Sequence, residues 1–435
     1  MKKIKRIKSG FFSRQLGVAK LAYKTGSDYF FSKKSEINEK VSETLSKRAQ
    51  EITSELSLMK GSLMKAGQML SMYGEAFLPP EANEFLKNLQ SNSTYLDWNE
   101  LVKEVPKEFL EKLNIESEPL AAASIGQVHL AKLKDQEEQN PLPTMALKIQ
   151  YPKVKKAIDS DLKALKLMLS SLKLLPRDID TEPVFEEIRQ MLYQETDYIK
   201  EMDFYKTYSE KLEGDDRFVL PNIYSDFSND HILATEYLDG HRIDSEYVQN
   251  LPKEDRNRLG DEYLDLYFRE LFEWGVVQTD AHIGNYLIVP TEQGPKWGLI
   301  DFGACKVVPQ PFLGNYRRLI KLCYEGKSED YKELLTEMGY IPADISPILY
   351  AQLWEYAQMI MIPLKIEKYD YGNSELPDEL MAKMTKIFGQ LRVEKIPSDG
   401  FFLDRKLGGV FITLKALNSE VHCQQILEKY LKLVD

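Results

Sequence analysis

Three residues in the second half of the chain have the types and the order needed to hold a nucleotide with a metal ion. Asp280 is followed by Asn285, and Asp301 then begins the tripeptide Asp-Phe-Gly. Carboxylate and amide oxygens are hard ligands that Mg²⁺ prefers, so Asn285 and Asp301 are the predicted metal ligands. Asp280 can orient or deprotonate an attacking hydroxyl group or water molecule. The alternative is that these side chains only cap turns.

A lysine upstream adds a second element of the same chemistry. Lys148 lies in the apolar segment 144–150, and a lysine inside a buried strand is unfavourable unless it is paired. Nucleotide phosphates and a helix glutamate would pair it. A lysine strand, an Asp–Asn loop and Asp-Phe-Gly occur in this order in protein kinases. The alternative is an edge strand that keeps the ammonium group in water.

Two further segments are expected to contact the nucleotide. An alanine-rich stretch stands where kinases carry a glycine-rich loop, and its backbone amides are predicted to approach the phosphates: Ala121, Ala122, Ala123 and Ser124. Alanine adopts positive φ reluctantly, so this loop should be stiff. Without its context an alanine run favours a helix. The segment containing Glu236 and Leu238 follows a strand, and we expect it to bind adenine through its backbone; the alternative is a plain strand end.

Helical segments supply the remaining candidates. Lys65 and Gln68 lie one turn apart and share a helix face, which by itself usually means a solvated surface. Glu195 and Asp197 are two positions apart, so they cannot share one helix face, and one of them is expected to lie at a bend or to point elsewhere. Glu201 is expected to pair with Lys148, with Glu195 as the alternative.

The elements that must position these residues follow from periodicity. A small strand-rich region is expected between a helical extension and a helical C-terminal region, giving an α+β fold with two lobes. The predicted segments are 1–34 (basic and amphipathic), 35–115 (helical extension), 116–237 (N-terminal lobe) and 238–435 (helical C-terminal lobe). Helices are predicted within 35–89, 101–113, 159–175 and 184–208, and strands at 125–133, 144–150, 218–219, 231–237, 286–289 and 297–300.

Charge is distributed unevenly along the chain. The formal net charge is −11, but residues 1–34 carry ten basic residues and one acid, so the rest of the chain carries −20. A basic segment interleaved with aromatic residues can lie on an anionic membrane. Two alternatives remain open, an arm packed on the acidic body and a mitochondrial presequence. An acidic chain is not expected to bind nucleic acid.

Length and composition exclude several classes of protein. The 435 residues exceed what one hydrophobic core supports, and 11% aromatic content argues against extensive disorder. Three cysteines exclude a disulfide scaffold and favour a reducing compartment. The most apolar segment, 347–364, contains polar residues and indicates a buried helix rather than a membrane span. The expected location is cytoplasmic, with peripheral membrane contact, or the mitochondrial matrix if the source is eukaryotic.

With these motifs together, the sequence closely resembles the UbiB/ADCK family of atypical kinases linked to coenzyme Q. The resemblance runs from about Lys60 to near Arg405. It rests on the KxGQ signature at Lys65–Gln68, the alanine loop PLAAASIGQVHLA, the lysine strand MALKIQYP and the ExD signature at Glu195 and Asp197 with Glu201 after it. Asp280, Asn285 and Asp301 match the catalytic loop and metal motif. Gln278 and Thr279 depart from the bacterial His-x-Asp form without touching the metal ligands.

The resemblance implies a protein-kinase-like fold whose extension covers the cleft for a protein substrate, with KxGQ facing ExD. It also implies Mg²⁺-dependent binding of ATP or ADP and ATPase activity in support of ubiquinone or isoprenoid-lipid metabolism, rather than phosphorylation of proteins in trans. Expected partners are the nucleotide, an anionic membrane surface and a quinone-like lipid. Two alternatives are a nucleotide-gated lipid-binding scaffold or chaperone, and a phosphotransferase acting on a small molecule or a protein.

Overall fold

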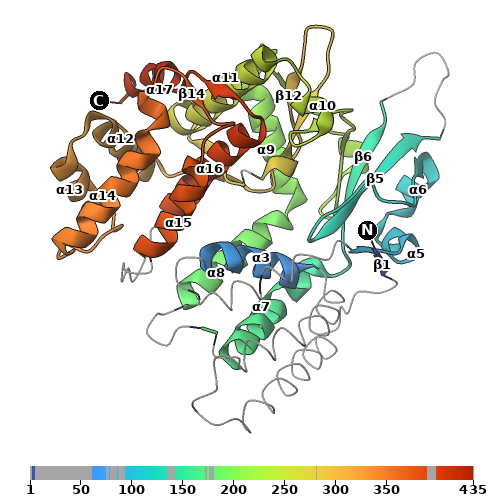
Figure 1. Ribbon diagram of the computed structural model, residues 1–435. Helices are drawn as coiled ribbons and strands as arrows, with labels where there is room; N and C mark the ends of the chain where they lie inside the picture. The colour runs from blue at the N-terminus through green and yellow to red at the C-terminus, as the bar shows by residue number, and fades with distance from the viewer. Residues whose placement is uncertain are drawn as a thin grey trace. The chain divides into compact units, whose positions relative to one another are not determined.

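The chain divides into two compact units (Figure 1). The first comprises Met1–Lys200 and Asn222–Tyr237, and the second Glu201–Pro221 and Leu238–Asp435. Both units contain helices and strands, so the predicted α+β class is confirmed. The finer division into four segments stays a prediction. The computed structural model describes residues 2–4, 61–74, 78, 86, 94–134, 143–171, 174–175, 181–280, 282–388 and 398–434.

The first unit is built on a five-stranded antiparallel sheet of order β3-β5-β6-β8, with β4 paired to β5. Its strands are β1 (Lys2–Ile4), β2 (Thr94–Leu96), β3 (Leu113–Ile115), β4 (Ala121–Ala122), β5 (Gly126–Leu133), β6 (Met145–Gln150) and β8 (Ile232–Glu236). Its helices are α3 (Ser62–Gly74), α5 (Trp98–Leu101), η1 (Val102–Glu104), α6 (Lys107–Lys112), α7 (Val154–Ser171), α8 (Glu182–Glu195) and η2 (Ser225–Phe227), while α9 (Tyr198–Lys211) starts here and continues into the second unit.

Alternation along the strands separates a core face of this sheet from the other face. Met145, Leu147 and Ile149 of β6 are fully buried and pack with the short helices α5 and α6. Lys148 shares the opposite face with Ala146, because side chains alternate along a strand. At the start of β5, a Cβ atom on Gly126 would lie 2.5 Å from the Ile149 carbonyl oxygen. Glycine at this position therefore allows the two strands to approach closely.

Within the predicted extension 35–115, helix α3 packs on α7 and α8 of the same unit (Figure 1), whereas residues 94–115 contain the short strands β2 and β3 as well as helices. Ser62, in its first turn, donates a hydrogen bond of 2.5 Å to the Asp161 carboxylate of α7, and both residues are buried. Leu63, Ala66 and Leu70 place an apolar face against these helices. This packing fixes the orientation of α3 and of the Lys65 side chain that it carries.

Only residues 2–4 of the basic N-terminal segment are described. They form β1, which pairs in parallel with β2, with Lys2 opposite Thr94 and Ile4 opposite Leu96. For these three residues the pairing agrees with the alternative of an arm packed on the folded body. Residues 5–60 lie outside the described part of the chain, so membrane contact by this segment stays a prediction.

A buried polar network joins β2 to the sheet. The Gln127 side chain accepts a bond from the Leu96 amide, donates to the Leu96 carbonyl oxygen and contacts His129 Nε2 at 3.1 Å. His129 Nδ1 lies 2.7 Å from the Glu116 carbonyl oxygen. A neutral imidazole that donates from Nδ1 and accepts at Nε2 satisfies all of these contacts. Burial lowers the pKa of His129 below 6.5, against the opposing effect of the Glu116 carbonyl.

This network predicts a loss of stability in mild acid. The folded state holds His129 neutral, whereas the unfolded chain takes up a proton near pH 6.5, so stability is complete above that pH and falls as the pH drops through it. His129→Gln should flatten the dependence of the urea unfolding midpoint on pH between 8 and 5.5. His231→Gln is the matched control, because it removes an exposed histidine next to the same sheet. An unchanged slope in His129→Gln would contradict the prediction.

The second unit is mainly helical. Its helical elements are α10 (Glu246–Gln249), α11 (Lys253–Arg269), η3 (Glu270–Trp274), η4 (Ile283–Asn285), α12 (Gln310–Glu325), α13 (Ser328–Glu337), α14 (Pro347–Met361), η5 (Pro363–Lys365), α15 (Leu376–Phe388), α16 (Ser398–Ala416) and α17 (Cys423–Leu431). Its strands are β7 (Phe218–Val219), β9 (His241–Arg242), β10 (Val276–Gln278), β11 (Tyr286–Val289), β12 (Lys296–Leu299), β13 (Cys305–Val307), β14 (Tyr369–Asp370) and β15 (Glu420–Val421).

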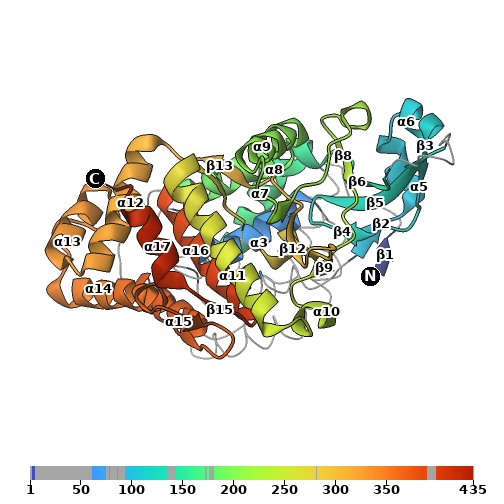
Figure 2. The same ribbon diagram turned by 90° about the horizontal axis from the view of Figure 1, so that it is seen from above.

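Helices α11, α16 and α17 run alongside one another and form the centre of the second unit (Figure 2). A four-stranded sheet of order β7-β12-β11-β9 and the two-stranded ladder β10-β13 hold the loops that carry Asp280 and Asp301. The apolar segment 347–364 forms α14 and most of η5, and the expected buried helix is buried only in part: Tyr350, Ala357 and Met361 are buried, whereas Ile348 is 75% exposed. No helix in the described part of the chain is long and apolar enough to span a membrane.

Most predicted elements are present, with two systematic differences. The helix predicted over 159–175 begins earlier, at Val154, and ends at Ser171. Its first turn contains the exposed residues Lys155 and Lys156 and lacks a clear apolar period, which is why the sequence pattern does not predict it. Several short strands were not predicted, since two or three residues are too few to show alternation; they are β1, β2, β3, β4, β9, β10, β13, β14 and β15. The strands predicted at 286–289 and 297–300 correspond to β11 and β12.

Candidate functional site

The second unit gathers the predicted catalytic loop and the Asp-Phe-Gly segment around one buried glutamine. Gln278, at the end of β10, accepts a 2.6 Å bond from the Asp280 amide and donates a 3.1 Å bond to the Asp301 carbonyl oxygen. Asn285 Nδ2 donates to the Asp280 carbonyl oxygen at 2.8 Å. These bonds fix the main chain at both aspartates. Asn285 therefore stabilises a turn through its amide nitrogen while its amide oxygen stays compatible with the predicted metal site.

Asp301 and the predicted helix glutamate meet at Gly303. Asp301 Oδ1 accepts a 3.0 Å bond from the Gly303 amide. A Cβ atom on Gly303 would lie 3.3 Å from Glu201 Oε2 and 3.4 Å from Asp301 Oδ1. Glu201 is 2% exposed, so a buried carboxylate stands against the metal motif at a point where a larger residue than glycine would fit tightly. Within the second unit, Glu201 is therefore placed beside Asp301.

Phe302 anchors this segment on α9. Its ring packs against Tyr205 and Tyr208, at centroid distances of 4.4 and 4.6 Å. Tyr205 also donates a hydrogen bond to the Ile300 carbonyl oxygen at 2.5 Å. The position of α9 and the position of Asp301 are consequently linked by direct contacts.

The donor atoms at this site fit a magnesium ion. The amide nitrogen of Asn285 is committed to the Asp280 carbonyl, so its amide oxygen is the atom that can bind a cation. The Asp301 carboxylate supplies a second hard oxygen. Mg²⁺ sites that serve nucleotides use one or two such side chains together with phosphate oxygens and water. Asn285 and Asp301 would hold the ion, which would neutralise charge on the phosphates.

Lys148 lies on an interior strand of the first unit. β6 is paired on one side with β5 and on the other with β8, so the alternative of an edge-strand lysine is wrong. The side chain is half-buried, and its ammonium nitrogen lies 5.2 Å from the centroid of the Tyr198 ring. A lysine on an interior strand matches the predicted phosphate-binding role. Lys148 and Glu201 belong to different units, and their pairing stays a prediction.

The alanine-rich segment is a hairpin and not a helix. Ala121 and Ala122 form β4, opposite Val128 and Gln127 of β5, and the turn is closed by a bond from the Ala123 amide to the Gly126 carbonyl oxygen. Ala121 and Ala123 are exposed, whereas Ala122 and Ser124 are half-buried. The prediction of a loop rather than a helix is confirmed, and the contact of its amides with phosphates stays a prediction.

The KxGQ and ExD residues meet within the first unit. Lys65 Nζ lies 2.6 Å from Glu195 Oε1, and the two side chains are only 14% and 15% exposed. Glu195 ends α8, while Asp197 accepts a bond from the Lys200 amide at the start of α9, so the expected bend lies between them. Gln68 is half-buried on the same helix as Lys65. Glu195 is thus a partner of Lys65, and the alternative that it also pairs with Lys148 stays a prediction.

The expected adenine-binding segment lies where the chain passes between the units. Glu236 ends β8 and accepts a 2.6 Å bond from Asn222 Nδ2, whereas Leu238 begins the second unit. The Tyr237 amide donates to the Thr144 carbonyl oxygen, which continues the ladder beyond β8. Binding of adenine by Glu236 and Leu238 stays a prediction.

Two residues that hold this site were not among the sequence candidates. Gln278 is the first, and we call its two bonds to the Asp280 amide and the Asp301 carbonyl oxygen the Gln278 brace. Its position two residues before Asp280 could have marked it as a candidate. Arg405 of α16 contacts the Asp280 carboxylate at 2.8 Å. It is separated from Asp280 by 125 positions, so no local pattern could have paired them.

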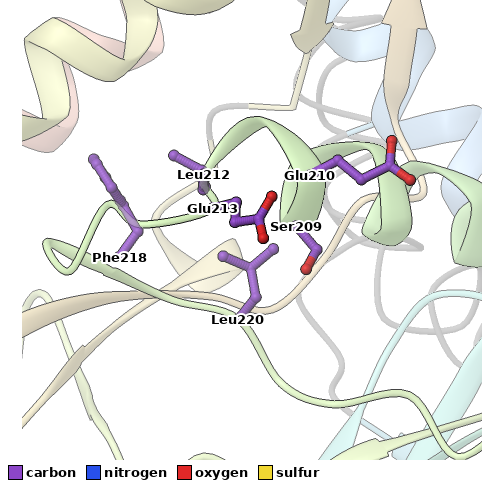
Figure 3. Close-up of a pocket in the computed structure, with 6 residues that line it drawn as sticks. All are labelled: Ser209, Glu210, Leu212, Glu213, Phe218 and Leu220. Atoms are coloured by element: carbon purple, nitrogen blue, oxygen red, sulfur yellow. The ribbon is translucent and has the colours of Figure 1, made fainter.

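A separate pocket of about 400 Å³ lies at the end of α9 in the second unit (Figure 3). It is lined by Ser209, Glu210, Leu212, Glu213, Phe218 and Leu220. None of the six is a predicted site residue. The pocket is lined by the exposed acidic side chains of Glu210 and Glu213 together with apolar side chains, of which Leu212 and Phe218 are buried.

Comparisons with known proteins agree with this chemistry. A family model described as the ABC1 atypical kinase-like domain matches residues 89–335. The atypical kinase COQ8 of Saccharomyces cerevisiae, a mitochondrial protein, is 27% identical over 87% of this chain and 75% of its own length. The mitochondrial atypical kinase COQ8B of Danio rerio is 27% identical over 94% of this chain and 65% of its own length.

One solved structure extends the likeness to the fold. The complex of Rv3197 with erythromycin, from Mycobacterium tuberculosis, has a TM-score of 0.59 and is 25% identical, covering 91% of this chain and 98% of that one. Together with the family match, this confirms the kinase-like fold predicted from the motifs.

Proposed function

The chain belongs to the ABC1 atypical kinase-like family, and on that premise we propose that it binds ATP or ADP together with Mg²⁺ and hydrolyses ATP. The observation that carries this proposal is the Gln278 brace, which ties the Asp280 amide to the Asp301 carbonyl oxygen. Gln278 thereby fixes the main chain of the proposed base, Asp280, relative to that of the proposed metal ligand, Asp301. Such positioning supports phosphoryl transfer, because that reaction depends chiefly on positioning and charge stabilisation.

Each residue has a defined part in the proposed reaction. Lys148 would contact the α- and β-phosphates, as its place on an interior strand supports. Asn285 and Asp301 would hold Mg²⁺ through their oxygen atoms. Asp280 would accept the proton of the attacking hydroxyl group or water, and its main chain is already fixed by Gln278 and Asn285.

The Lys65–Glu195 ion pair supports an acceptor other than a protein. It ties the extension helix α3 to the end of α8 through two nearly buried side chains. Removal of one partner would leave the other charge poorly solvated, so the extension is held in place rather than loosely attached. An extension held in this way favours hydrolysis or transfer to a small molecule over phosphorylation of proteins in trans.

A role in ubiquinone or isoprenoid-lipid metabolism follows from the family motifs and from relatives that bear the name COQ8. Those relatives are named as mitochondrial, which favours the mitochondrial matrix over the cytoplasm if the source is eukaryotic. Contact with an anionic membrane surface is part of the proposal and rests on the charge of residues 1–34.

Release of phosphate from ATP by the purified full chain tests this function. We expect turnover that requires Mg²⁺ and rises when vesicles containing anionic phospholipid are added at low salt. Vesicles of neutral phospholipid are the control, because the expected attraction is electrostatic. A quinone-like headgroup compound is added in a further arm.

Three results would redirect the proposal. Tight binding of Mg-ADP with no turnover would favour the nucleotide-gated scaffold. Phosphate found on an added protein or metabolite would favour a phosphotransferase. Equal turnover with anionic and neutral vesicles would remove the membrane contact while leaving the nucleotide chemistry in place.

A further inference from the structure

The carboxylate of Asp280 is held by a residue from the far end of the chain. Arg405 Nη2 lies 2.8 Å from Asp280 Oδ1, and the two side chains are 22% and 23% exposed. A guanidinium–carboxylate contact of this length is a charge-assisted hydrogen bond, stronger and more directional than a neutral one. Gln278 and Asn285 hold the main chain of Asp280, whereas Arg405 contacts its side chain directly.

The helix that carries Arg405 is anchored by the next residue. Lys406 is 1% exposed, lies 3.5 Å from the Glu270 carboxylate and donates to the Tyr286 hydroxyl oxygen at 3.0 Å. Consecutive residues on a helix point about 100° apart, so one side of α16 enters the core while the adjacent side reaches the catalytic loop. A buried charge that is paired at one place resists sliding or rotation of its helix.

The same anchor reaches α9. Tyr208 of α9 donates a 2.8 Å hydrogen bond to Glu270 Oε1, and its ring packs on Phe302. Glu201 lies seven positions earlier on α9, on the same face, beside Gly303. The buried Glu270 thus joins the helix that carries Arg405 to the helix that contacts the metal motif.

We propose that Arg405 is a positioning residue that sets the side-chain orientation of Asp280. The buried Lys406–Glu270 pair holds α16 in the position that this contact requires. The assignment rests on the proposed function for its catalytic meaning. The N–H directions of the planar guanidinium are fixed, so even a single contact from arginine is more directional than one from a lysine ammonium group. The C-terminal region is in this way part of the catalytic apparatus, although it supplies no group to the nucleotide.

The catalytic test uses ATP turnover by the full chain. Arg405→Met should lower kcat by about 100-fold, as expected when a reacting group is misplaced, while the KM for Mg-ATP stays within about threefold. Arg405→Lys should restore part of kcat, because it returns the charge without the fork. The matched control is Lys415→Met, which removes a lysine of the same helix that pairs with Asp378 at the surface. Equal losses in Arg405→Met and Lys415→Met would overturn the proposal.

A second measurement tests the contact without any turnover. In thermal unfolding, Arg405→Met should lower Tm by about 2–4 °C in the wild-type background and much less when Asp280→Asn is already present. Equal decreases in both backgrounds would overturn the assignment. Absence of ATP turnover in the wild-type chain would reject the proposed function, while this cycle would still decide whether Arg405 and Asp280 are coupled.

Discussion

Replacing Asp301 with asparagine is expected to lower ATP turnover by about 100-fold or more. The substitution keeps the shape of the side chain and an acceptor for the Gly303 amide, but it removes the negative charge that would hold Mg²⁺. A higher concentration of Mg²⁺ should then be needed for half-maximal turnover. Phosphate release measured across a Mg²⁺ titration checks both the rate and the metal dependence.

The control for this substitution is Asp330→Asn, which makes the same chemical change at an exposed position on α13. It should retain the wild-type rate and Mg²⁺ requirement. Thermal unfolding of both variants separates a loss of chemistry from a loss of fold. Wild-type turnover in Asp301→Asn would mean that the Asp-Phe-Gly segment is not the metal site.

Replacing Lys406 with methionine is expected to lower the free energy of unfolding by about 3–5 kcal/mol. Burial raises the pKa of the Glu270 carboxyl, and the Lys406 ammonium group and the Tyr208 hydroxyl act against that rise. Without Lys406, Glu270 must either stay charged without its cation or take up a proton. The deficit measured by urea unfolding should therefore be larger at pH 8 than at pH 5, where protonation is easier.

Two companion variants test the cause of that deficit. Lys415→Met should cost no more than about 1 kcal/mol, because its partner Asp378 is exposed. The double substitution Lys406→Met with Glu270→Gln should recover part of the loss, since it removes the second charge as well. A double variant as unstable as Lys406→Met would indicate that lost packing, and not an unpaired carboxylate, is responsible.

The parts of the site that sequence predicted correctly are those encoded by short, contiguous motifs. Lys148 could be placed on a strand because its neighbours are apolar. Asp280, Asn285 and Asp301 could be grouped because their order and spacing, with an apolar strand after Asn285, match those of protein kinases. The bend between Glu195 and Asp197 also followed from helical geometry alone.

The parts that sequence could not predict depend on contacts between distant segments. Arg405 pairs with Asp280 across a separation that leaves no periodic signal. The meeting of Lys65 with Glu195 has no such signal either, and only the family resemblance led us to expect it. A lysine and an arginine in sequence on α16 resemble an ordinary solvated surface, yet Lys406 is 1% exposed. Whether a charged side chain can be buried depends on the partner that the tertiary structure provides, and the local sequence does not contain that information.

The tight approach of β5 and β6 has a consequence for how variation can accumulate in this region. Alanine already occupies three successive positions of the hairpin, at 121–123, and glycine could replace any of them without meeting a neighbour. The reverse exchange at Gly126 would drive a methyl group into the Ile149 carbonyl oxygen, one residue from Lys148 along the strand. Glycine at 121–123 is therefore compatible with this hairpin, whereas alanine at 126 is expected to force β5 and β6 apart beside Lys148.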